Sequence, residues 1–113
     1  MDGSDIRAAG VIVKYGYHGT WSDFLSAIAN EGLAPSEDWP GPALFIAVDD
    51  DIAAQFGEYV LRFPWPEDAD MEEDEEVPGG FYADVEITPD VIEILADPIW
   101  RIWVRLIDWE GLV

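Results

Sequence analysis

The chain has 113 residues, half of them apolar, and 25 acidic residues against five basic ones give it a formal net charge of −20. This length is typical of one domain spanning residues 1–113, and 13% aromatic residues bring too much apolar surface to stay unfolded in water. The charge repels phosphate backbones, which argues against direct nucleic-acid binding and favours a protein partner with a basic surface.

The chain contains no cysteine, which excludes disulfides and thiolate metal sites and makes a cytoplasmic location the simplest expectation. Residues 1–5 have no basic region followed by an apolar run, so we expect no signal peptide. No stretch approaches the roughly 20 apolar residues of a membrane span. We therefore expect no membrane association.

The first predicted elements are a strand and a helix. Residues 11–17 are rich in β-branched and aromatic types, which predicts a strand that ends at His18-Gly19-Thr20. Thr20 or Ser22 can then cap a helix whose apolar residues recur at helical spacing, with Gly32 as its stop. The single histidine is thereby placed between a strand and a capped helix.

A proline-rich loop over 34–42 leads to a predicted strand at 43–48. Asp49, Asp50 and Asp51 precede a short helix over 52–57, where acids suit the positive end of the helix. This triplet could instead bind a divalent cation, but it has no glycine-spaced calcium loop around it, so helix capping is the preferred interpretation and we expect no metal. A further strand is predicted at 59–63.

Eight of the ten residues from 67 to 76 are acidic, which predicts a solvated, mobile loop. A strand follows at 81–87, and Thr88-Pro89-Asp90 predicts the start of a helix that runs through Leu95. The last strand, over 100–107, alternates an apolar face with a face that carries Arg101, Trp103 and Arg105. Those arginines could meet a pyrophosphate or, by default, an acidic segment of the same chain.

The order of these pieces is distinctive. His18-Gly19-Thr20 is followed by a helix running into Glu31-Gly32-Leu33-Ala34-Pro35, by the strand Leu44-Phe45-Ile46-Ala47, and by a short helix that carries Ala53 and Phe56. This series resembles the ADP-ribosyltransferase superfamily, in the branch whose three signature positions are His, Tyr and Glu. The resemblance covers roughly residues 11–63 and, more loosely, the strand and Thr88-Pro89 segment beyond the acidic run.

The resemblance implies an α+β fold in which small split antiparallel sheets, with two or three short helices, clamp NAD as substrate. The family histidine bonds a ribose hydroxyl and the following glycine holds the nicotinamide amide through its backbone, which places those roles on His18 and Gly19, with Thr20 beside them. The stacking aromatic falls on Phe45, which lacks the hydroxyl of the usual tyrosine. His18 could alternatively bond a nearby loop, and Phe45 could be a core aromatic.

The third signature residue is a glutamate that polarises a ribose hydroxyl, and Gly79-Gly80 stands near its usual place. Glu76 is the nearest candidate upstream, with Glu75 and Glu86 as alternatives, although Glu76 could also be one more solvated acid. Two functions follow as expectations. One is a mono-ADP-ribosyltransferase-like protein that modifies a protein partner. The other is an inactive acidic inhibitor or decoy that binds a basic surface.

Overall fold

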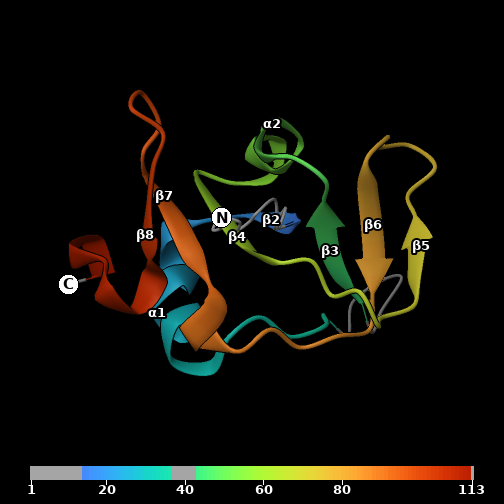
Figure 1. The fold of residues 1–113 in the computed structure, drawn as a ribbon, viewed down its shortest axis with the longest axis horizontal. Helices are drawn as coiled ribbons and strands as arrows, with labels where there is room; N and C mark the ends of the chain where they lie inside the picture. Colours follow the sequence, from blue (N-terminus) through green and yellow to red (C-terminus); the bar gives the residue numbers. More distant parts are fainter. Residues whose placement is uncertain (1–13, 37–42, 113) are drawn as a thin grey trace, which may run out of the picture.

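The computed structural model of the protein describes residues 14–36 and 43–112. Within these residues the fold is α+β, with one antiparallel sheet of seven strands in the order β5-β6-β3-β2-β4-β7-β8 (Figure 1). The strands are β2 (Tyr15–Thr20), β3 (Leu44–Ala47), β4 (Tyr59–Pro64), β5 (Met71–Glu73), β6 (Gly80–Ala83), β7 (Glu93–Asp97) and β8 (Ile102–Arg105).

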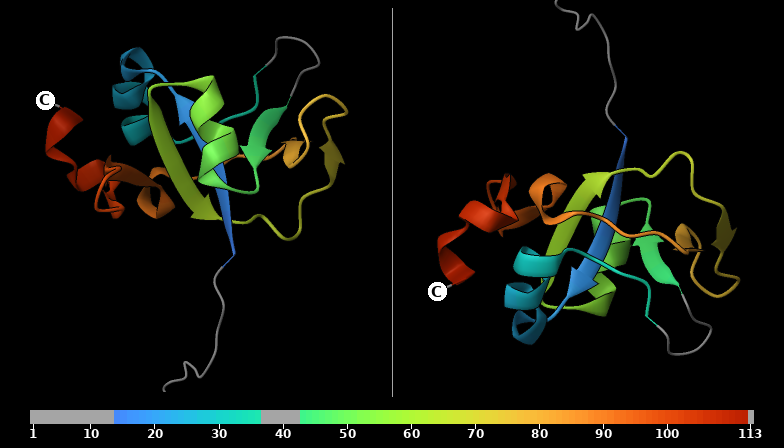
Figure 2. Two further views of the ribbon diagram at one scale, coloured as in Figure 1. Left: turned by 90° about the horizontal axis from the view of Figure 1, so that it is seen from above. Right: turned by 90° about the horizontal axis from the view of Figure 1, so that it is seen from below.

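Two helices pack on opposite faces of this sheet, α1 (Ser22–Glu31) on one and α2 (Asp50–Ala53) on the other, as the two views of Figure 2 show. A 3₁₀ turn, Ala54–Phe56, continues α2. Further 3₁₀ turns lie at Pro89–Val91, Leu106–Asp108 and Glu110–Leu112. No helix in residues 14–36 and 43–112 is long and apolar enough to cross a membrane.

The sheet is nearly divided between β2 and β3. β2 pairs with β4 along its whole length, from Tyr15 opposite Pro64 to Thr20 opposite Tyr59. Between β2 and β3, in contrast, the ladder consists of one pair, Tyr17 with Ala47. The expected antiparallel α+β fold is confirmed, but the expected separate sheets are one sheet with a thin junction. We call the place where β2 and β3 diverge the split.

The main core lies between the sheet and α1. Leu25 and Ile28 of α1 are buried there together with Phe63 of β4 and Ile46 of β3. Gly32 ends the helix as predicted, with a φ of 84° that disfavours a side chain.

The start of α1 differs from the prediction. Trp21 holds the N-cap position and its side chain makes no capping bond. The Ser22 N–H donates instead to the Glu58 carboxylate at 3.2 Å. A carboxylate from a distant part of the sequence can satisfy a free N–H of the first turn as well as a local hydroxyl.

The acidic triplet acts as the helix start that the sequence indicates. The Asp49 carboxylate accepts the Ile52 N–H at 2.9 Å, and Asp50 and Asp51 occupy the first turn of α2. Ala53, the last residue of α2, is fully buried and packs with Ala47 and Val60 in a second, smaller core. The capping interpretation of the triplet is therefore confirmed.

Three predictions require correction. The acidic run is not simply a loop, because Met71–Glu73 form the edge strand β5, which pairs with β6 while Glu72 and Glu73 stay exposed. The helix predicted through Leu95 is reduced to the Pro89–Val91 turn, since the residues after it form β7. The first strand runs on through Thr20, so His18 lies within the strand and not at its end. Residues 11–13 of the predicted first strand and residues 37–42 of the predicted loop lie outside the described residues.

Candidate functional site

His18 bridges the split with its side chain. Its Nδ1 lies 2.9 Å from the Phe45 carbonyl oxygen, so Nδ1–H donates and the imidazole joins β2 to β3 where their backbones no longer pair. Burial lowers the pKa of His18 below its ordinary 6.5, and the bond to Phe45 offsets this only in part. The ring is therefore neutral at pH 7, with Nε2 left as a hydrogen-bond acceptor.

A pocket of about 340 Å³ lies next to His18, between the end of β2 and α1. Its walls come from His18-Gly19-Thr20, from α1 and from Gly32-Leu33-Ala34. Two large aromatic side chains also line it, Trp21 and Phe24, which are 51% and 56% exposed. Exposed aromatic rings beside a neutral histidine suit a planar, polar-edged ligand. We call this the His18 pocket.

Gly19 and Thr20 both line the His18 pocket, and both also have structural roles. A Cβ at Gly19 would collide with the Ala53 carbonyl oxygen. The space that glycine leaves free here is therefore occupied by the backbone of α2. Thr20 is buried, and its backbone is in close contact with Gly57. These two residues fix the position of α2 relative to β2.

The ring of Phe45 does not share the His18 pocket. Side chains alternate along a strand, and Phe45 points with Ala47 into the α2 core, whereas Leu44 and Ile46 point into the α1 core. Gly80 packs directly against the Phe45 ring, and Tyr82 meets it edge-on at 5.5 Å between centroids. Phe45 thus contacts His18 through its carbonyl group and is otherwise a half-buried packing residue.

Phe56 is the aromatic residue that sequence reasoning missed. Its ring lies 4.9 Å from that of Phe45 and is 40% exposed, so it offers the accessible aromatic face on the α2 side. The signal was present in the sequence, because Phe56 belongs to the ordered series of motifs, but its exposure follows only from the short 3₁₀ turn that carries it.

None of the three candidate glutamates lines the His18 pocket. Glu75 and Glu76 are exposed in the turn between β5 and β6, and Glu86 is exposed beyond β6. That turn does abut α2, because Gly79 packs against the Ile52 side chain, and the Val48 N–H just before α2 donates to the Gly79 carbonyl at 2.9 Å. Glu75 and Glu76 therefore belong to the side of the sheet that carries Phe45 and Phe56, whereas the His18 pocket opens on the α1 side.

Asp74 organises the turn that carries these glutamates. Its carboxylate accepts the Glu76 N–H at 2.7 Å, the Val77 N–H at 3.2 Å and the Tyr82 hydroxyl at 2.7 Å. These bonds lower the pKa of Asp74, and the bond from Tyr82 contributes most. Since Tyr82 also packs on Phe45, Asp74 ties the turn to the Phe45 cluster, which consists of Phe45, Phe56 and Tyr82. Asp74 stands in a run of acids, where nothing in the sequence distinguishes it.

Each lysine or arginine of the described segments already has a partner within the chain. Arg62 donates to Glu93 at 2.7 Å, and Arg105 lies 3.3 Å from Asp108. Arg101 forms an ion pair with Asp50, and Lys14 lies over the ring of Trp65. The default expectation, pairing with an acidic segment of the same chain, is confirmed for Arg101, because Asp50 belongs to the acidic triplet; Arg105 pairs instead with a nearby acid of its own segment. Among the described residues, no Lys or Arg lines the His18 pocket.

No family model matches the sequence, and no curated protein matches it either. Within the described segments, no three His, Asp or Glu side chains are arranged to hold a metal ion.

Proposed function

We propose that the protein binds NAD across the split and acts as a small mono-ADP-ribosyltransferase-like protein on a protein partner. The observation that carries the proposal is His18: a neutral imidazole fixed at the split, with Nδ1–H bonded to Phe45 and Nε2 unpartnered among the described residues. An acceptor nitrogen in this setting suits a ribose hydroxyl.

Aromatic surfaces on the two sides of the split support the same proposal. Trp21 and Phe24 can stack on a purine in the His18 pocket, and Phe56 with Phe45 can stack on a nicotinamide ring on the α2 side. A ligand that reaches both must pass through the split between β2 and β3, beyond the single Tyr17–Ala47 pair, and a dinucleotide has the length to do so. Because none of the described lysines and arginines lines the pocket, we expect weak binding of the pyrophosphate and hence modest affinity.

The transfer step breaks the bond between nicotinamide nitrogen and ribose C1′. Nicotinamide leaves with the electron pair, the acceptor nucleophile forms the new bond to C1′, and its proton passes to solvent or to a carboxylate. Positive charge develops on the ribose in the transition state, and a carboxylate bonded to a ribose hydroxyl stabilises it. Glu76 is the proposed carboxylate, with Glu75 and Glu86 as alternatives, since its turn abuts α2 beside Phe45.

Incubation with labelled NAD and a cell extract tests this activity. We expect release of nicotinamide together with labelled protein, and a loss of about 100-fold or more in Glu76→Gln. Glu67→Gln removes another acid of the same run and should leave the rate unchanged. Full activity in Glu76→Gln with loss in Glu75→Gln or Glu86→Gln would move the role to that residue, and absence of both products would contradict the activity.

A second function, an acidic inhibitor or decoy, is favoured by a different observation. Gly80 pairs with Ala47, directly across β3 from Tyr17, so the strand position where the family glutamate is expected carries no carboxylate. The net charge of −20 then remains the dominant surface property. Such a protein would bind its basic partner without NAD, and binding would weaken steeply with salt.

A further inference from the structure

The β7–β8 hairpin ends in a strongly apolar tip. Ile99 and Trp100 are 83% and 76% exposed, and Ile102, at the start of β8, is 48% exposed. In Figure 1 this hairpin extends away from the rest of the fold, so its tip is accessible from several directions. Ile99 and Trp100 are the most exposed of the large apolar residues in the described segments. We call Ile99, Trp100 and Ile102 the hairpin tip.

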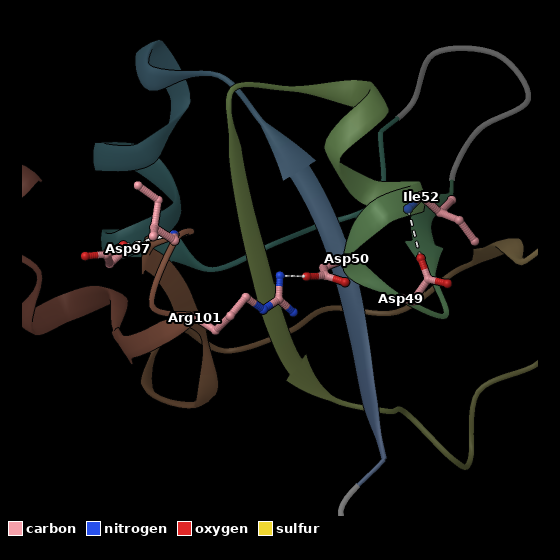
Figure 3. Close-up of polar contacts among 6 residues, drawn as sticks. Asp49, Asp50, Ile52, Asp97 and Arg101 are labelled. Atoms are coloured by element: carbon pink, nitrogen blue, oxygen red, sulfur yellow. Dashed lines mark hydrogen bonds and ion pairs between the residues drawn. The ribbon is translucent and has the colours of Figure 1, made fainter.

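The tip is held in one conformation by polar contacts. The Asp97 carboxylate accepts the N–H groups of Ile99 and Trp100, both at 3.0 Å, and thereby closes the turn. Arg101 follows in the left-handed backbone region, with φ of 58°, and its guanidinium reaches α2 to pair with Asp50 (Figure 3). The turn is therefore anchored at its base and to a second element of the fold.

This arrangement is unfavourable for the isolated chain. A left-handed backbone conformation is strained for a residue other than glycine, and an exposed tryptophan gains nothing from burial. Strained residues that are held by surrounding contacts occur preferentially at functional positions. A tryptophan that is already ordered also loses little conformational entropy on binding, and tryptophan is enriched among residues that dominate interface energies.

We propose that the hairpin tip inserts into an apolar pocket of another protein, and that Lys and Arg side chains border this pocket. The negative charge of the chain is the reason for expecting Lys and Arg side chains around this pocket. Asp97 and Asp50 lie beside the tip, and the nearby Arg101 is neutralised by Asp50. A second copy of the chain or an anionic membrane would bring like charge against a net charge of −20. The proposal does not depend on NAD binding.

Site-specific photo-crosslinking on the full chain tests this proposal. The photoreactive residue p-benzoyl-L-phenylalanine replaces Trp100 in one variant and, as a control outside both the tip and the His18 pocket, the exposed Ile107 of the Leu106–Asp108 turn in another. Both are irradiated in an extract of the cells that produce the protein. We expect position 100, and not position 107, to link to one protein at a site lined by apolar side chains and flanked by lysines or arginines.

The captured protein is then purified and titrated with the unmodified chain. Trp100→Ser should weaken binding by about tenfold or more, whereas Ile107→Ser should change it by less than about twofold, and added salt should weaken binding of the unmodified chain. Circular dichroism checks that both variants fold. Three results of these experiments would overturn the proposal: no adduct at position 100, an adduct only with a second copy of the chain, or equal loss of binding in both variants. A fourth would be Trp100-dependent sedimentation of the chain with vesicles of phosphatidylcholine, with or without phosphatidylglycerol.

Discussion

The two sides of the split are held together in different ways. On one side β2, β4, β7 and β8 form ladders of two to six residue pairs, with one register shift between β7 and β8, over a core of fully buried residues such as Leu61 and Ile94. On the other side β3, β6 and β5 form a smaller unit whose edge strand is mostly acidic and exposed. One backbone pair and the His18 imidazole join the two sides within the sheet.

This difference assigns most of the stability to the larger side. The larger side provides most of the apolar burial, while the smaller side presents the acidic turn and the Phe45 cluster beside α2. A split that is closed by a side chain can open at lower cost than a full ladder. The following predictions test whether the two sides differ in this way.

The largest effect is expected in the core of the larger side. Phe63→Ala removes a fully buried ring and should lower the free energy of unfolding by about 3–5 kcal/mol. Met71→Ala, on the edge strand β5, should cost about 1 kcal/mol or less because Met71 is only partly buried. Urea denaturation measures both. Equal losses would contradict the assignment of stability to the larger side.

Gly19 tests the contact between β2 and α2. Gly19→Ala places a methyl group against the Ala53 carbonyl, so α2 must shift, and we expect a loss of about 1–3 kcal/mol in the free energy of unfolding. Thermal unfolding, with NMR chemical shifts of α2 as a local readout, measures this. Wild-type stability and unchanged chemical shifts would contradict a close contact between Gly19 and the Ala53 carbonyl.

His18 provides the pH test of the junction. Its pKa is lowered in the folded state, so the unfolded chain binds the proton more readily below pH 6.5 and stability is lost as the pH falls from that value. His18→Phe should cost about 1 kcal/mol at pH 7, because the Phe45 carbonyl loses its donor. The stability difference between wild type and variant should shrink by at most about 1.4 kcal/mol per pH unit below pH 6.5. A pH-independent difference between pH 5 and pH 7 would contradict a neutral, bridging His18.

The smallest effect is expected at the acidic turn. The bond to Asp74 raises the pKa of Tyr82, so Asp74→Asn should lower the titration midpoint of that phenol. Ultraviolet absorbance of the tyrosinate, compared with a Tyr82→Phe reference that identifies its contribution, measures the shift. Glu75→Gln in the same turn is the control and should leave the midpoint unchanged. A midpoint unaffected by Asp74→Asn would show that Asp74 does not tie the turn to Tyr82.

Local sequence signals predicted much of the fold. The spacing of Leu25 and Ile28, with Gly32 as a stop, gave α1, and Asp49 gave the start of α2. They failed where a distant strand decided the outcome. Pairing with β6 makes Met71–Glu73 a strand despite the acidic charge, and pairing with β4 and β8 extends the chain after Val91 despite the helix signal at Thr88-Pro89.

The candidate site was predictable only in part. His18, Gly19 and Thr20 are adjacent in the sequence and line one pocket. The opposite orientation of the Phe45 ring depends on the register of β3, which the sequence does not reveal. The exposure of Phe56 and the partners of Asp74 arise from tertiary packing alone.

Calorimetric titration of the full chain with NAD tests the central claim most directly. We predict saturable binding at one site, weakened by about tenfold or more when Trp21 and Phe24 of the His18 pocket are both replaced by serine. Trp100→Ser, on the separate hairpin tip, should leave the affinity unchanged. Absence of saturable binding at about 1 mM NAD, or binding indifferent to the Trp21 and Phe24 changes, would contradict a dinucleotide site at the split.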